Sequence, residues 1–348
     1  MKFIHIADVH LGMKPDLCFK WSDSRVAEMF ETFNKVIDVC NKEHIDLLLI
    51  AGDLFHSQPS VKLLKEVNYS FSKLENTKVV LMAGNHDYAT EGSNINEFTW
   101  LDHVHMLSSK KAESVYIEDL DTYVYGFSYD RRNITVNRYD DLAPYDASKI
   151  NILLAHGGEP NYVPIDFNKL KQSKFDYVAL GHIHKPEILC EKIAYAGSLE
   201  PLDKTELGEH GYIYGEVTKE HCDIRLVPFA KRKYVKLIKE VEGTITNSEL
   251  VDSLRDNIDR IGAEHIYSII IKGYKQPELL FDIESLKEPY NIIGFKDESM
   301  PDYDFRALYE DNIDNIIGMY ISKINDMDID EDMKNKALYL GIDALMKH

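Results

Sequence analysis

The sequence predicts an α/β fold in which two sheets pack face to face and helices cover their outer surfaces. In the first half, short apolar runs typical of buried strands alternate with amphipathic helical segments. Further short strands, joined by charged or glycine-rich turns, continue to about residue 229, and a two-sheet sandwich accommodates them better than one doubly wound sheet. Hydrophobic residues make up 44% of the 348 residues, so a large core can be buried.

The first elements follow from their apolar spacing. Lys2–Ala7, Leu47–Ala51 and Val79–Ala83 are continuous apolar runs and are predicted as buried strands. Residues 24–43 carry apolar side chains at spacings of three and four, which predicts a helix with one buried face. A second helix is expected over about 60–76, after Pro59.

The next part of the chain is predicted to be richer in strands. Residues 114–129 resemble a hairpin with a turn at Asp119–Asp121. Five further strands are expected, at Ile150–Ala155, Tyr177–Leu180, Lys192–Ala196, Tyr212–Val217 and Asp223–Val227.

Near residue 230 the composition changes, which predicts three domains: 1–230, 231–296 and 297–348. The middle one is expected to be a small α+β module with a helix over about 247–261 and a strand at 265–272. The last is acidic, with 13 Asp or Glu against 5 Lys or Arg, and a helix is expected at 331–346. It also carries a helical stripe of apolar residues at 305, 308, 309, 316, 317, 320 and 324.

Bulk properties exclude several classes of protein. No apolar run approaches the roughly 20 residues of a membrane helix, and the N-terminus does not resemble a signal peptide, so a cytoplasmic location is expected. None of the four cysteines has CxxC spacing, which disfavours a zinc ribbon or a thioredoxin motif. A net charge of −19 argues against tight DNA binding by the chain alone, although a local metal site or a partner could supply the grip.

Five predicted strands each end in polar residues able to bind metals. These segments are Asp8-Val9-His10, Gly52-Asp53-Leu54-Phe55-His56, Gly84-Asn85-His86-Asp87, His156-Gly157-Gly158 and Gly181-His182-Ile183-His184. Ligands gather at the carboxyl ends of strands in α/β sheets, so the five ends are expected to meet. Taken singly, each could be a turn, a polar cap or exposed surface, but the ordered set predicts a site.

The residue types suit paired divalent cations. Imidazoles and carboxylates fit manganese, iron or zinc, and the absence of thiolates disfavours a structural zinc site. Two metals about 3.5–4 Å apart need a bridging carboxylate, for which Asp53 is suited. Such a pair activates a water and keeps the site positive enough to attract a phosphodiester.

The order of these five motifs resembles the calcineurin-like metallophosphoesterase superfamily, and the match covers roughly residues 1–230. Ala7-Asp8-Val9-His10-Leu11-Gly12 and Gly52-Asp53-Leu54-Phe55-His56 resemble the SbcD-type nucleases, the bacterial relatives of the nuclease in the eukaryotic MRN complex. The resemblance implies a four-layer αββα sandwich with a small cap domain and C-terminal helices. It also implies a manganese-dependent endonuclease and 3′-5′ exonuclease of DNA repair and recombination, with iron or zinc as alternative metals.

The same resemblance implies roles for individual residues. One metal would be held by Asp8, His10, Asp53 and His184, and the other by Asp53, Asn85, His156 and His182. His86 would protonate the leaving 3′ oxygen, and His56 would contact the scissile phosphate. Asp87 could orient His86 or simply cap a turn.

Partners are implied as well. The family's nuclease domains dimerise, their cap contacts DNA, and their C-terminal helices dock on an SbcC-like SMC-type ATPase. The apolar stripe suits such docking, but packing against its own cap domain is an equal alternative. The DNA contacts rest here on Lys231, Arg232 and Lys233, and a solvated loop is preferred for Arg131 and Arg132.

Two rival functions remain. The first is a phosphoesterase acting on another phosphodiester or a phosphomonoester; Leu54-Phe55-His56 argues against the protein phosphatase branch. The second is a scaffold without catalysis, which should have lost metal ligands, whereas every expected ligand is present.

Overall fold

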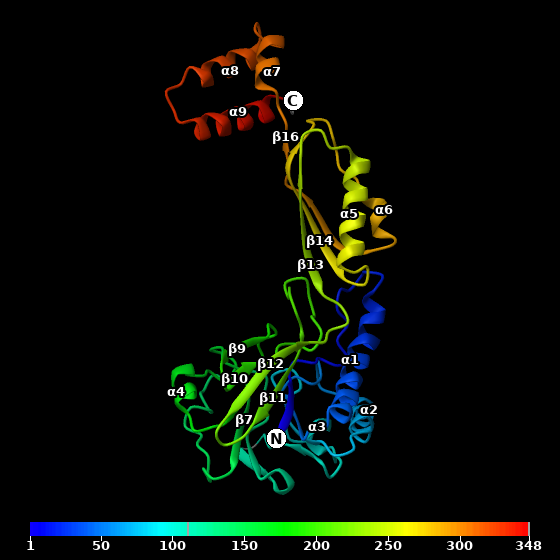
Figure 1. The fold of residues 1–348 in the computed structure, drawn as a ribbon, viewed down its shortest axis with the longest axis vertical. Coiled ribbons are helices and arrows are strands. Elements are labelled where there is room, and N and C mark those ends of the chain that lie inside the picture. Colours follow the sequence, from blue (N-terminus) through cyan, green and yellow to red (C-terminus); the bar gives the residue numbers. More distant parts are fainter. Residues whose placement is uncertain (110, 347–348) are drawn as a thin grey trace. The chain divides into compact units, whose positions relative to one another are not determined.

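The structure is a computed structural model that describes residues 1–109 and 111–346, and it divides into two compact units, Met1–Tyr234 and Val235–His348 (Figure 1). The helices of the first unit are α1 (Ser22–Lys42), α2 (Val61–Phe71), α3 (Asn94–Glu97), the 3-10 turn η1 (Glu118–Leu120) and α4 (Phe167–Gln172). Its strands are β1 (Lys2–Ile6), β2 (Leu47–Ala51), β3 (Lys78–Met82), β4 (Val104–Met106), β5 (Glu113–Ile117), β6 (Thr122–Gly126), β7 (Ile150–His156), β8 (Tyr177–Gly181), β9 (Glu187–Cys190), β10 (Ile193–Tyr195), β11 (Gly211–Val217) and β12 (Cys222–Pro228).

The strands of the first unit form two six-stranded sheets. One has the order β12-β11-β1-β2-β3-β4 and the other β5-β6-β7-β8-β10-β9. The centre of each is parallel: β1, β2, β3 and β4 run together in the first, and β6, β7, β8 and β10 in the second. The carboxyl ends of β1, β2 and β3 therefore share one edge of the first sheet, and those of β7 and β8 share an edge of the second.

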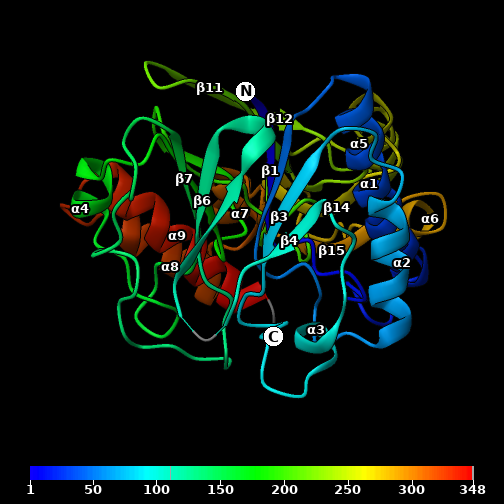
Figure 2. The same ribbon diagram turned by 90° about the horizontal axis from the view of Figure 1, so that it is seen from below.

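Side-chain alternation along the strands creates the layers. On β1, Ile4 and Ile6 face the core that contains α1 and α2, whereas Phe3 faces the core between the two sheets. On β7, Leu154 points into the core between the sheets and Leu153 into the outer core that includes Leu170 of α4. Figure 2 shows the resulting order of helices, sheet, sheet and helix. The predicted four-layer αββα sandwich is confirmed.

Behind α1 lies a buried ionic network. The Arg25 guanidinium is fully buried and donates to the carboxylate of Glu200 and to the Pro201 carbonyl oxygen. Thr32 donates to the other oxygen of Glu200. Both Nη atoms of Arg25 therefore meet strong acceptors, which is the condition under which a buried charge is tolerated, whereas the buried Nε atom has no hydrogen-bond partner among the described residues. The network ties α1 to the segment that follows the second sheet.

His5 gives the first unit a built-in sensitivity to acid. It is fully buried on β1, and its Nδ1 lies 2.8 Å from the Tyr177 hydroxyl oxygen. Burial lowers the pKa of His5 from 6.5 to about 3. The unfolded chain takes up this proton near pH 6.5 and the folded protein does not, so the fold loses about 1.4 kcal/mol for each pH unit below 6.5.

We expect His5→Asn, which keeps a polar partner for Tyr177, to lose about 2 kcal/mol less free energy of unfolding than the wild type between pH 6.5 and 5. Urea denaturation at both pH values measures the difference. The exposed His44→Asn is the control and should follow the wild type. Equal pH slopes in wild type and His5→Asn would show that His5 does not carry this sensitivity.

The second unit combines a small sheet with helices. Its strands are β13 (Tyr234–Val241), which starts at the last residue of the first unit, β14 (Ile266–Lys275), β15 (Asn291–Asp297) and β16 (Met300–Pro301). Its helices are α5 (Asn247–Ile261), α6 (Glu284–Lys287), α7 (Phe305–Asp311), α8 (Ile316–Asn325) and α9 (Glu331–Met346). A capping box between Thr246 and Glu249 starts α5, and Gly262 ends it. The cap module and C-terminal helices are as predicted for the fold class, while the three domain boundaries stay a prediction.

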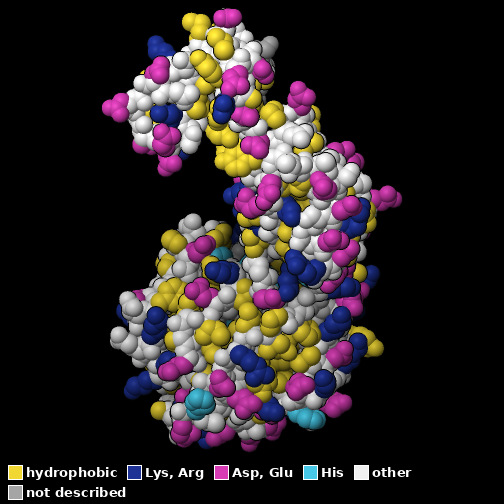
Figure 3. Space-filling view, turned by 45° about the horizontal axis from the view of Figure 1, so that its top comes forward, with side chains coloured by type: hydrophobic (Ala, Val, Ile, Leu, Met, Phe, Trp, Pro, Cys, Tyr) yellow, Lys and Arg dark blue, Asp and Glu magenta, His cyan; other side chains and the backbone are white. Residues whose placement is uncertain are grey.

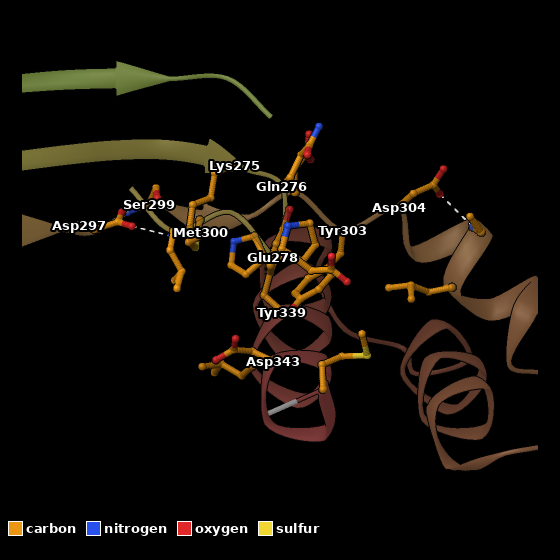
Figure 4. A pocket seen from close by; sticks show the side chains of 18 of the residues that line it. Lys275, Gln276, Glu278, Asp297, Ser299, Met300, Tyr303, Asp304, Tyr339 and Asp343 are labelled. Carbon is orange, nitrogen blue, oxygen red and sulfur yellow. Dashed lines mark hydrogen bonds and ion pairs between the residues drawn. The ribbon is translucent and has the colours of Figure 1, made fainter. Parts of the chain in front are cut away.

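Within this unit a groove of about 930 Å³ separates the end of the sheet from α7 and α9 (Figure 4). Met300 and Ser299 line it on the sheet side, and Tyr339 and Asp343 line it from α9. Its charged side chains are mostly acidic, and Lys275 is paired with Asp297 at 2.6 Å.

Among the described residues, no helix is both long and apolar enough to cross a membrane.

Candidate metal centre

Strand ends from both sheets converge on one place. β1, β2 and β3 of the first sheet run into Asp8, Asp53 and Asn85, while His156 ends β7 and His182 follows β8 of the second. The loops after β1 and β2 continue the parallel ladder, because the Asp8 amide donates to the Gly52 carbonyl and the His10 amide to that of Asp53. The structure thus brings together all seven predicted ligands, which span 177 positions of the sequence from Asp8 to His184.

Unusual backbone conformations hold these residues. Asp8, His10 and Asp53 each have φ of 49°, and His182 has φ of 96°. Such left-handed conformations cost about 1–3 kcal/mol each and persist where the surrounding structure over-determines them. Gly84 has a different reason to be glycine, since a Cβ there would lie 2.3 Å from Asp53 Oδ1. The loops are therefore built around the positions of the polar side chains.

The first group of converging atoms belongs to Asp8, His10 and His184, whose ligand atoms lie within 4.8 Å of one another. The Nε2 atoms of His10 and His184 are 3.2 Å apart. The Asp8 carboxylate is fully buried and accepts the amide N–H of His182. Burial raises the pKa of Asp8 to about 6, although the neighbouring histidines oppose this.

The second group is centred on Asn85. Its side-chain oxygen lies 2.9 Å from His156 Nε2 and 3.0 Å from His182 Nδ1. Asn85 and His156 are buried, with 3% and 0% of their surface exposed. One amide oxygen and two imidazole nitrogens therefore face the same small volume.

Asp53 lies between the two groups. Its Oδ2 is 3.4 Å from His156 Nε2 and 3.8 Å from His10 Nε2. Burial opposes its ionisation, but the charge and hydrogen bond of His156 keep the pKa of Asp53 below its ordinary value. Within 1–109 and 111–346, the ion pairs of this carboxylate are with histidines, so a divalent cation on either side finds an anionic ligand without a competing Lys or Arg. This donor set fits two cations that share Asp53.

Groups behind the ligands fix their orientation. His156 Nδ1 donates to the Ala51 carbonyl, which leaves Nε2 facing Asn85. His184 Nδ1 donates to Glu206 at 2.7 Å. Sequence reasoning missed Glu206, because it lies in the loop between β10 and β11 and no motif or spacing marks it.

Buried tyrosines hold the backbone at His156, and they too were missed. The hydroxyls of Tyr129 and Tyr139 lie 3.0 and 3.3 Å from the His156 carbonyl oxygen, and Tyr139 also accepts the His156 amide. The Tyr195 hydroxyl donates to the Gly157 carbonyl. These residues read as core aromatics in the sequence, and only their three-dimensional neighbours reveal the polar role.

The two predicted catalytic histidines lie beside the metal ligands. His86 Nδ1 donates to the carbonyl of His56 at 3.0 Å, and the His86 amide donates to Asp53 Oδ1. The ring centroids of His56 and His86 are 5.4 Å apart in a stacked arrangement, and His10 Nδ1 is 3.4 Å from His56 Nδ1. Burial, then the proximity of His86, lowers the pKa of His56.

Asp87 contacts backbone rather than the His86 ring in the described structure. Its two oxygens accept the amides of Gly84 and Phe55, and the side chain is fully buried. Burial, then the charge of Asp53, raises its pKa to about 7. These contacts correspond to the turn-capping alternative, and the orienting partner of His86 is the His56 carbonyl.

The three basic residues predicted to contact DNA each have an acidic partner. Lys231 pairs with Glu31 at 2.8 Å, Arg232 with Glu28 at 2.6 Å and Lys233 with Glu209 at 2.6 Å. Much of their charge is thereby neutralised inside the first unit, which weakens the case for them as phosphate contacts.

Comparison with known proteins agrees with this geometry. Residues 1–186 match the family model described as calcineurin-like phosphoesterase. The chain is 31% identical over 245 residues to the DNA double-strand break repair protein Mre11 of Methanocaldococcus jannaschii, which covers 66% of this chain and 63% of that protein. It is 31% identical over 241 residues to the metallophosphoesterase YhaO of Bacillus subtilis, with 63% and 58% covered.

A longer alignment joins the chain to the Mre11 protein of Sulfurisphaera tokodaii, at 24% identity over 364 residues, covering 93% of this chain and 88% of that protein. The chain spans less than two thirds of the length of the Bacillus and Methanocaldococcus relatives.

Proposed function

This chain belongs to the calcineurin-like phosphoesterase family, and from that premise we propose that it is a metal-dependent DNA nuclease acting in DNA repair. The observation that supports hydrolysis of phosphoesters is the pair of ligand groups joined by Asp53, with His86 and His56 beside them. The relatives named as double-strand break repair proteins support DNA as the substrate. Asp8, His10, Asp53 and His184 would hold one cation, and Asp53, Asn85, His156 and His182 the other.

Two divalent cations, manganese in our proposal with iron or zinc as alternatives, supply an activated water and neutralise charge on the phosphate. Water adds to phosphorus and the bond from phosphorus to the 3′ oxygen breaks. His86, held through Nδ1, presents Nε2 to that oxygen and gives it a proton. His56, stacked on His86, contacts the phosphate.

The test is cleavage of a labelled linear duplex and a labelled single strand with Mn²⁺, with EDTA as the control and bis-p-nitrophenyl phosphate as a second substrate. The proposal expects endonucleolytic cuts and 3′-5′ shortening, both stopped by EDTA. Hydrolysis of the small diester alone would favour the second candidate function, a phosphoesterase that acts on another substrate. The net charge of −19 and the ion pairs of Lys231 and Lys233 support this second candidate.

The proposal extends to domains and location. Residues 1–230 would be the nuclease domain, 231–296 a cap that contacts DNA and 297–348 the docking segment. We propose a homodimer, as the resemblance to the SbcD-type nucleases implies, and a location in the cytoplasm. Sedimentation of the metal-loaded protein tests the dimer.

The proposed partner is an SbcC-like SMC-type ATPase that binds the C-terminal helices. Most of the predicted apolar stripe packs inside the helical cluster itself, including Phe305, Ile317 and Tyr320. The most exposed apolar side chains of α8 are Ile316, which belongs to the stripe, and Met319, which does not, each 67% exposed. Figure 3 shows apolar patches among acidic side chains on this part of the molecule. Docking would therefore use this exposed set and not the stripe as a whole.

A further inference from the structure

We propose that Glu206 is the positioning residue for His184 and that it strengthens cation binding selectively at the site containing His184. The inference rests on the metal-dependent function proposed above. It concerns a residue outside all five strand-end motifs.

The Glu206 carboxylate is held by three donors. His184 Nδ1 lies 2.7 Å from Oε1, and Oε2 accepts the Ser198 hydroxyl at 3.0 Å and the Leu202 amide at 2.9 Å. Only 13% of the Glu206 side chain is exposed. The carboxylate is therefore fixed in place and cannot readily exchange His184 for water.

This contact decides which nitrogen of His184 is available. A carboxylate on Nδ1 keeps the proton there and leaves the lone pair on Nε2, which lies 3.2 Å from His10 Nε2 and faces the first ligand group. A carboxylate behind an imidazole also makes the ring a stronger donor, and removing such a partner typically weakens metal affinity 10- to 100-fold.

The second ligand group lacks an equivalent buried carboxylate among the described residues. His156 donates to a neutral acceptor, the Ala51 carbonyl. His182 faces Glu159 at 3.2 Å through Nε2, but the Glu159 side chain is 55% exposed, so water competes for that contact. The two sites thus differ in the groups behind their histidines, in addition to the carboxylate of Asp8 in the first set where the second has the amide of Asn85.

The backbone shows why Glu206 can reach His184. The Ser198 amide donates to the His184 carbonyl at 2.9 Å, which ties the start of the loop to the ligand. Gly197 makes this approach possible: its φ is +73°, and a Cβ there would lie 2.6 Å from the His184 carbonyl oxygen. The Ser198 hydroxyl donates to Glu206, so Ser198 links the loop that carries Glu206 to His184.

The test is stepwise Mn²⁺ binding to the full chain, measured by electron paramagnetic resonance of the free ion. Glu206→Gln keeps the size of the side chain and removes its charge. We expect it to weaken one of the two sites roughly 10- to 100-fold and to leave the other within about 3-fold. The matched control is Glu209→Gln, three residues along, whose side chain is 47% exposed and paired with Lys233; it should leave both sites unchanged.

A double-mutant cycle assigns the weakened site. Added to Asn85→Ala, which disables the second group, Glu206→Gln should retain its full effect on the remaining site. Added to His184→Ala, it should have no further effect. Ser198→Ala, which removes one donor but keeps the carboxylate, should cause a smaller loss at the same site.

Unchanged affinity in Glu206→Gln, equal losses at both sites, or absence of Mn²⁺ binding by the wild type would each overturn the inference. Because the readout is binding, a loss at the His184 site supports it even where the wild type cleaves no DNA, a result that would overturn the nuclease proposal alone. Far-ultraviolet circular dichroism of the metal-free variants checks that the fold is retained.

Discussion

Replacing Asp53 by asparagine is expected to weaken Mn²⁺ binding at both sites, by more than the roughly 10- to 100-fold that loss of a group behind a ligand typically costs. The reason is position: Asp53 Oδ2 lies 3.4 Å from His156 of one ligand group and 3.8 Å from His10 of the other. An asparagine removes the negative charge that both cations would share. The asparagine side chain also has only one oxygen, which would either bind a cation or accept the His86 backbone amide that in the wild type donates to Asp53 Oδ1 at 2.8 Å.

Isothermal titration with Mn²⁺ measures the effect, and nuclease activity should fall in parallel. Asp102→Asn, an exposed acid outside the site, is the matched control and should bind like the wild type. Metal loss confined to a single site would contradict the bridging role of Asp53 and would require a different bridging ligand.

His86→Ala should abolish DNA cleavage, with a loss of about 10²- to 10⁴-fold, while leaving the metal content intact. His86 is not a member of either proposed ligand set, and its Nδ1 is occupied by the His56 carbonyl. Its ring is therefore oriented to move a proton through Nε2. His103→Ala is the matched control, since that imidazole contacts the Phe71 carbonyl away from the site.

Two substrates with different leaving groups distinguish loss of acid catalysis from a general loss of active-site structure. A 3′ deoxyribose oxygen needs a proton as it departs, whereas p-nitrophenolate departs readily without one. The His86→Ala variant should thus lose much less activity on bis-p-nitrophenyl phosphate than on DNA. Equal losses on both substrates, or loss of bound metal, would remove His86 from the acid role.

Much of the first unit could be predicted because its signals are local. The apolar runs that became β1, β2 and β3 were found to within a residue or two, since a strand buried on both faces is a continuous apolar run. Helix α1 was predicted from apolar residues at spacings of three and four, which mark its buried face. The second predicted helix ended later than α2, which ends at Phe71. The apolar spacing continues to the buried Leu74, but the amides of Lys73 and Leu74 donate to carbonyls three residues back, so the α-helix has already ended.

Other elements had weaker local signals. β4 and β16 have three and two residues and form because a neighbouring strand is already in place. β15 was missed because its burial is irregular along seven residues. The apolar stripe of the last segment was seen, but its choice of partner depends on α9, which contributes Leu338 and Ile342 to the cluster.

The metal ligands were recognisable because each follows a strand within a few residues, so chain order predicts their place at the sheet edge. Glu206, Tyr129 and Tyr139 carry no such mark. Their contacts with the ligands depend on the conformations of the loops around the site, which cannot be predicted from the spacing of residues in the sequence. The acidic partners of Lys231 and Lys233 are equally remote, and the basic cluster looks unpaired in the sequence.

The origin of the ligands in two separate sheets has a consequence for how the molecule folds. Asp8, Asp53 and Asn85 come from the first sheet, whereas His156, His182 and His184 come from the second, so neither sheet alone contains a complete binding group. A ribosome-bound chain must emerge past residue 184 before a cation can be captured. Ions that bind only the assembled pair of sheets lower the free energy of the native state alone, and so act as late cross-links that slow its opening.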